Sequence, residues 1–146
     1  MKPIIEKKTR KKNVYFTISW SDFLPMEKHL INNKVPSIAG LFELYYLDDN
    51  KTLRFIGRDR AYYGGLRNTL RQISDPTLPS VVAMEAVPTD KPLYFRYSHV
   101  ESQDDMDDLL FFLEQTRFSE QDVFDHSGRY TNIYVNEHSP GGLHSL

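Results

Sequence analysis

Arginines flank a pair of tyrosines along one short stretch of this 146-residue sequence, between positions 58 and 71. Guanidinium groups bind phosphate oxygens through paired N–H donors, and tyrosine rings provide flat faces on which bases stack. This mixture suits contact with single-stranded nucleic acid, with the arginines on the backbone and the rings between the bases. The alternative is that the rings only pack and the arginines lie on a solvated helix face. The residues are Arg58, Arg60, Tyr62, Tyr63, Arg67 and Arg71.

A second concentration of positive charge lies in residues 1–12, which carry six lysines and arginines against one glutamate. This stretch is +5 in a chain of net charge −2, so the remainder carries −7. A basic arm attracts nucleic acid because phosphate contacts release counterions, but a solvated, disordered terminus has the same composition. We predict a disordered arm here. The acidic remainder argues against nucleic-acid binding elsewhere unless one face is locally basic.

Several kinds of chemistry are excluded by what the sequence lacks. There is no cysteine, which rules out disulfides and cysteine-ligated zinc, and the five histidines show no mutual ligand spacing. No phosphate loop, dinucleotide fingerprint or nucleophile elbow is present. No apolar run approaches the roughly 20 residues that cross a bilayer. We therefore expect a cytoplasmic protein that needs no cofactor and has no membrane partner.

The arginines and tyrosines follow a predicted strand pair, which must position them. Residues 40–47 are aromatic and branched, which favours a half-buried strand, and residues 52–57 form the return strand. Between them, Asp48, Asp49 and Asn50 are typical turn residues. From Leu66, apolar residues at helical spacing predict a helix that ends before Pro76.

The remaining elements predict one α+β domain. Its fold is a small mixed or antiparallel sheet with a central β-hairpin flanked by helices, extended at the N-terminus by a strand and a helix. We place this domain at residues 13–138, with its core at about 36–135, after the arm and before a flexible tail at 139–146. The expected elements are a strand at 14–20, a helix from Ser21 to Asn33, a strand at 93–100, a helix from Ser102 and a strand or extended tail at 130–135. Residues 80–87 suit a strand or a helix equally, and 118–124 a short helical turn.

The hairpin resembles the core of the GIY-YIG nuclease family. That family opens with a Gly-Ile-Tyr strand, returns with Tyr-Ile-Gly and continues into a helix with a catalytic arginine. Here the two triplets are Gly40-Leu41-Phe42 and Phe55-Ile56-Gly57, so both tyrosines are replaced by phenylalanine. The family's C-terminal asparagine is loosely matched by Asn132. The resemblance implies a GIY-YIG-like fold with the relic motif Gly40, Phe42, Phe55, Gly57 and Asn132.

The resemblance also implies a site that has lost its hydroxyls, because a phenyl ring cannot donate, accept or deprotonate. Our first expectation is therefore a catalytically inactive module that binds nucleic acid or a protein. One alternative is an active endonuclease or phosphodiesterase that uses Arg67 with Tyr46 or Tyr63, and Mg²⁺ or Mn²⁺ held by Asp108. The other is a structural domain whose surplus tyrosines form a homodimer interface.

Overall fold

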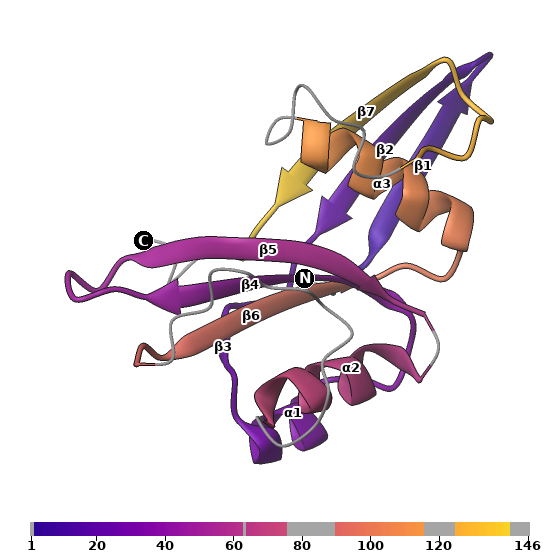
Figure 1. The fold of residues 1–146 in the computed structure, drawn as a ribbon. Helices are drawn as coiled ribbons and strands as arrows, with labels where there is room; N and C mark the ends of the chain where they lie inside the picture. The colour runs from indigo at the N-terminus through magenta and orange to yellow at the C-terminus, as the bar shows by residue number, and fades with distance from the viewer. Residues whose placement is uncertain (1, 63, 76–89, 116–124, 141–146) are drawn as a thin grey trace.

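The computed structural model describes residues 2–62, 64–75, 90–115 and 125–140, which form two sheets and three helices (Figure 1). One sheet has three strands in the order β1-β2-β7, and the other has four in the order β3-β6-β4-β5. This confirms the predicted α+β class, although the N-terminal strand belongs to a second sheet instead of extending the first. The elements are β1 (Ile5–Arg10), β2 (Asn13–Ser19), β3 (Leu24–Pro25), α1 (Lys28–Lys34), β4 (Gly40–Leu47), β5 (Leu53–Ala61), α2 (Gly65–Ser74), β6 (Leu93–His99), α3 (Gln103–Gln115) and β7 (Asn132–His138).

The predicted hairpin is present as β4 and β5, and β4 also pairs antiparallel with β6. Asp48 closes the turn, since its Oδ1 accepts the N–H groups of Asn50 and Thr52, both at 2.9 Å. Lys51 supplies the left-handed backbone that the turn requires, with φ of 63°. Gly40 is needed at the start of β4, because a Cβ there would overlap the carbonyl oxygen of Ser98.

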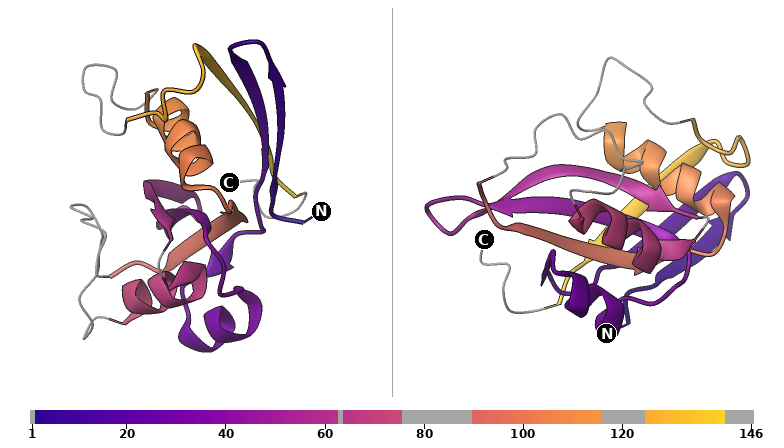
Figure 2. Two further views of the ribbon diagram at one scale, coloured as in Figure 1. Left: turned by 90° about the vertical axis from the view of Figure 1, so that its right-hand side faces the viewer. Right: turned by 60° about the horizontal axis from the view of Figure 1, so that its bottom comes forward.

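Each sheet buries one face against helices. The face of β4 that carries Phe42 and Leu44 packs under α1 and α2. In the three-stranded sheet, alternate apolar residues of β2 pack on α3, as the period-2 pattern predicts. Figure 2 (left) shows α3 on one side of this sheet, and none of the described helices lies on the other side. The buried β2 and α3 residues are Val14, Phe16, Ile18, Met106, Leu109, Leu110 and Leu113.

The predicted helix from Ser102 is confirmed, and the Ser102 Oγ accepts the Asp105 N–H at 3.2 Å. Of the strand or extended tail expected at 130–135, residues 132–135 are strand and belong to β7, which lies parallel to β2. The predictions for 80–87 and 118–124 fall outside the described residues.

Two predictions near the N-terminus are wrong. The expected disordered arm contains β1, which pairs with β2 from Ile5 to Arg10. A lysine-rich strand fits this place because it lies at a sheet edge, where most of its side chains reach solvent. The first helix begins at Lys28 and not after Ser21, since the Ser21 Oγ accepts the N–H of Tyr97 in β6 at 3.0 Å. Glu27 caps that helix instead.

Candidate functional site

The residues of the predicted relic motif do not converge on one site. Phe42 is fully buried on the helix-covered face of β4. A β-bulge in β5 shifts the register, so that Phe55 pairs with Tyr45 and lies on the opposite face. Gly57 has open space where a Cβ would lie. Asn132 lies in the other sheet, where its Nδ2 donates to the Asn13 Oδ1 at 2.9 Å.

The predicted catalytic residues also lie apart. The Arg67 Nε donates to the carbonyl oxygen of Val35 at 2.7 Å, which ties α2 to the end of α1. Tyr46 lies on β4 opposite Arg54 of the hairpin, and Tyr63 is outside the described residues. Asp108 lies on α3, which Figure 1 shows on the far side of the four-stranded sheet from α2. The geometry therefore does not bring the proposed nucleophile, arginine and metal ligand together.

Asp108 has a clear role within α3. It is fully buried, and its carboxylate accepts the Ser127 N–H at 2.7 Å and the Ser127 Oγ–H at 2.9 Å. The Arg129 Nη2 donates to it at 2.8 Å and to Asp105 at the same distance. These donors anchor the loop that precedes β7. Among the described residues, no cluster of three or more histidines and carboxylates could hold a metal ion.

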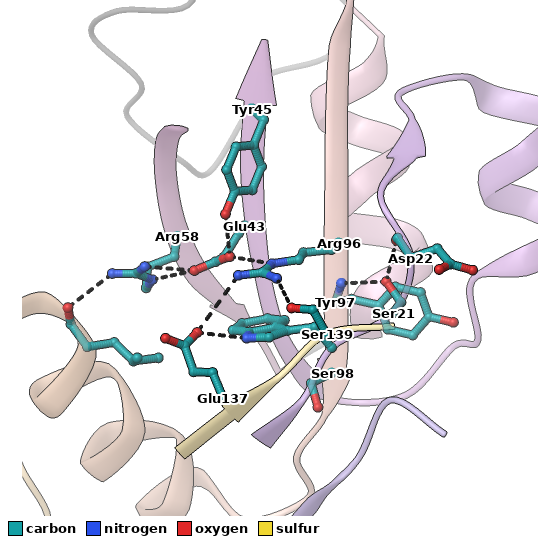
Figure 3. Close-up of polar contacts among 12 residues, drawn as sticks. Ser21, Asp22, Glu43, Tyr45, Arg58, Arg96, Tyr97, Ser98, Glu137 and Ser139 are labelled. Atoms are coloured by element: carbon teal, nitrogen blue, oxygen red, sulfur yellow. Dashed lines mark hydrogen bonds and ion pairs between the residues drawn. The ribbon is translucent and has the colours of Figure 1, made fainter. Parts of the chain in front are cut away.

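A buried carboxylate, Glu43, occupies the face of the four-stranded sheet that is turned towards α3 and β7 (Figure 3). Its Oε2 accepts two bonds from Arg58, at 2.9 and 2.7 Å, and its Oε1 accepts one from Arg96 at 2.6 Å and one from Tyr45 at 2.7 Å. Burial by itself raises the pKa of Glu43, but the charges of Arg96 and Arg58 and these hydrogen bonds hold that pKa below its ordinary value. We call these four residues the Glu43 network.

The Glu43 network joins the two sheets. The Arg96 guanidinium lies 4.6 Å from the ring centroid of Trp20, at the end of β2, and its Nη1 donates to the Ser139 Oγ at 2.7 Å. The Trp20 Nε1–H donates to Glu137 of β7 at 2.8 Å. Arg58 also donates to the carbonyl oxygen of Leu113 at the end of α3, at 3.1 Å. The network therefore acts as an internal clamp.

This clamp changes the interpretation of the predicted nucleic-acid contacts. The Arg58 side chain is only 11% exposed and is already bound to carboxylates, and Arg60 pairs with Asp107 of α3. Arg71 is exposed, but it lies on α2, apart from these two. Tyr62 is exposed after the end of β5. The five of these residues that the structure describes therefore do not form one surface.

A different surface combines aromatic and basic groups. We define the outer face as the residues of β1, β2 and β7 that are turned away from α3. Tyr15 and Tyr134 are paired across neighbouring strands there, with ring centroids 5.1 Å apart and planes 13° apart. They are 44% and 47% exposed, among the largest exposures of any large hydrophobic side chain in the described residues.

Positive charge borders these two rings. Lys8 lies opposite Tyr15 and Arg10 opposite Asn13, and both are exposed. Within the described part of the chain, neither cation forms an ion pair. Two further lysines form the turn between β1 and β2, whereas Glu6 is the one acid that β1 places on this face. The remaining members of the outer face are Asn13, Thr17, Ser19, Asn132, Asn136 and His138.

Part of this surface could have been found in the sequence. If residues 5–10 are a strand, their alternation puts Lys8 and Arg10 on one face, and Tyr15 lies on the polar side of its own strand. The missing signal is the parallel pairing of β7 with β2, which connects residues about 120 positions apart, such as Tyr15 and Tyr134.

The chain belongs to a protein family whose description says nothing of activity. A model of the family described as "Uncharacterised protein" matches residues 4–145. No curated protein and no solved structure matches the chain. Among the described residues, no helix has the length and apolar character needed to cross a membrane.

Proposed function

We propose that the outer face binds single-stranded nucleic acid. The observation that carries this proposal is the exposed, stacked pair Tyr15 and Tyr134 with the unpaired cations Lys8 and Arg10 beside it. Bases of a single strand stack on exposed rings, and a neighbouring row of cations follows the phosphates. A flat sheet face suits unpaired bases better than a duplex, whose bases are already stacked on one another. We propose the cytoplasm as the location of this activity.

The charge distribution supports this face over others. The chain is acidic outside its first twelve residues, and several of its arginines are neutralised inside by carboxylates. Lys8 and Arg10 keep their full charge for a phosphate partner. Each phosphate that they neutralise releases counterions, which favours binding and makes it sensitive to salt.

A homodimer through the same face is the competing use of the two rings. A two-fold interface would bury the same patch on both copies. It would therefore bring the cations of one β1 strand close to those of the other, and like charges across an interface oppose association. We accordingly favour an anionic partner. Sedimentation at high micromolar protein distinguishes the two, because a monomer that binds nucleic acid counts against the dimer.

The experiment is fluorescence anisotropy with a labelled strand of about 12 nucleotides, within the length that one such face covers. Replacing Tyr134→Ala removes half of the stack, and loss of one stacked base costs about 1–3 kcal/mol. We therefore expect affinity to fall at least about fivefold. The matched control is Tyr62→Ala, an exposed tyrosine on the other sheet, which should leave affinity unchanged.

Salt dependence tests the role of the cations. The double variant Lys8→Gln/Arg10→Gln should make the slope of log affinity against log salt shallower by about 1.4, because each lost single-strand phosphate contact contributes about 0.7. Lys28→Gln on α1 should leave the slope as it is. Binding that is absent in low salt, or that is equally strong in all of these variants, would refute the proposal.

We also propose that the hairpin half of the chain is a divergent, inactive GIY-YIG-like fold. Support comes from the strand order β5-β4-β6, with the first motif strand in the centre, and from the helices that follow β5 and β6. Phenylalanine stands at both tyrosine positions, and Thr69 stands where the helical arginine is expected. Incubation of a plasmid with the protein and Mg²⁺ or Mn²⁺ should give no cleavage. Cleavage that is lost in Arg67→Ala would overturn the inactive assignment.

A further inference from the structure

A cavity of about 350 Å³ lies where α3 ends beside β7. Five of its lining side chains are aromatic, and one of them is Tyr134 of the exposed stack. β7 is an edge strand of its sheet in the described structure, so the outer face continues around this edge into the cavity. The aromatic lining residues are Phe111, Phe112, His126, Tyr130 and Tyr134.

Part of the cavity wall, at Phe111 and His126, is held in place by a ring contact and hydrogen bonds. The His126 ring meets the Phe111 ring edge to face, with centroids 4.8 Å apart and planes 69° apart. The His126 Nδ1 accepts the Gly128 N–H at 3.0 Å, so a neutral His126 carries its proton on Nε2. The same loop is anchored to α3 through Ser127 and the buried Asp108. The cavity is therefore lined by rings in fixed positions.

The polar side chains that line the cavity include two amides, those of Gln115 and Asn132. Gln115, the last residue of α3, is exposed and lines the cavity, and its side-chain amide makes no hydrogen bond within the described part of the chain. A free primary amide offers one acceptor and one donor side by side, which matches the N6 amino group and N7 of adenine. The amide of Asn132, also in the lining, is already bonded to Asn13.

We propose that this cavity takes one base of the strand bound on the outer face, and that Gln115 selects adenine there. The inference rests on the proposed function, because the strand must first lie across Tyr134. The volume is at the lower end of the range for small-molecule sites, about 300–1,000 Å³, which suits a single base between aromatic walls. The outer face then supplies affinity without sequence preference, and the cavity supplies the preference.

The test compares two labelled strands of equal length, an oligothymidine and the same strand with one central adenine. A bidentate amide–base contact discriminates by at least about fivefold. We therefore expect the adenine strand to bind the wild-type protein about fivefold more tightly. Gln115→Ala should abolish this ratio and leave oligothymidine binding and its salt slope unchanged. Gln103→Ala, an exposed glutamine at the other end of α3, should keep the ratio.

The outcomes separate this inference from the proposed function. Equal binding of both strands by the wild type, with the expected loss in Tyr134→Ala, overturns the adenine pocket and leaves the outer face intact. A ratio that persists in Gln115→Ala also overturns it. Failure of both strands to bind at low salt overturns both proposals. Adenosine monophosphate distinguishes a free nucleotide from a strand: if it binds the protein while the strands do not, the cavity is a nucleotide site and the strand version is wrong.

Discussion

The Glu43 network offers a sharp test of how the two sheets are held together. Glu43→Gln replaces one carboxylate oxygen by an NH₂ group. This group would face the same N–H or O–H groups whose hydrogen bonds the oxygen had accepted. Arg58 and Arg96, each with a side chain only 11% exposed, would lose their shared anion. Removing one partner from a buried ion pair costs about 3–5 kcal/mol. We expect the lower end, about 3 kcal/mol, because both arginines keep other acceptors.

The assay is equilibrium unfolding in urea, followed by tryptophan fluorescence. Trp20 is the single tryptophan and is fully buried against Arg96, so it reports on the junction itself. A domain of ordinary stability, about 5–15 kcal/mol, would remain folded after this loss. The control is Glu6→Gln on the exposed edge strand, where a change within about 0.5 kcal/mol is expected.

The pH dependence gives a second readout of the same substitution. The pKa of Glu43 is lower in the folded protein than its ordinary value of 4.5. A lowered folded-state pKa contributes stability that is present above pH 4.5 and is lost as pH falls through the folded value. The stability difference between wild type and Glu43→Gln should therefore be constant near neutral pH and shrink in acid. A difference below about 1 kcal/mol at pH 7 would refute the clamp.

Four further substitutions test local features of the fold. Gly40→Ala should cost about 3 kcal/mol or more because its Cβ would overlap backbone, whereas Gly57→Ala should be neutral or stabilising by about 0.5 kcal/mol; urea unfolding checks both. Lys51→Gly should raise stability by up to about 1 kcal/mol by relieving the left-handed backbone, and a lower melting temperature would contradict this. Asp108→Asn should cost about 1.5–3 kcal/mol through lost charge-assisted bonds. The wild-type melting temperature should not respond to Mg²⁺; a rise that disappears in Asp108→Asn would instead identify a metal ligand.

Local sequence patterns predict the strand pair, its turn and the helices that follow β5 and β6, because short-range chemistry decides each of them. Asp48 bonds the backbone of its own turn, and Ser102 caps the helix that it begins. The first helix is the exception. Ser21 has the right side chain for a cap, but a neighbouring strand uses it, and pairing of residues 24–25 with β6 delays the helix. Tertiary contacts here override a local preference.

The predicted site residues lie apart for a different reason, because the prediction depended on which side chains share a face. Without the bulge in β5, Phe55 would pair with Tyr46 and share a face with Phe42. One extra residue in β5 reverses that arrangement. Gly57, which lies next to the extra residue Ile56, is a local sign of the bulge, because an isolated glycine inside a strand often marks one. A single acid in the apolar strand 40–47, Glu43, was also a visible sign that a cation would lie opposite.

Counting cations along the chain does not show which of them are neutralised, because it ignores their partners in the fold. Arg58 and Arg60 lie within β5, and carboxylates of β4 and α3 neutralise them. The first strand lies at a sheet edge, where Lys8 forms no ion pair within the described residues. Phosphate affinity depends on charge that remains unneutralised in the folded state. Lys8 and Arg10 of β1 meet this condition among the described residues, which is why we propose that a polyanion binds on the outer face.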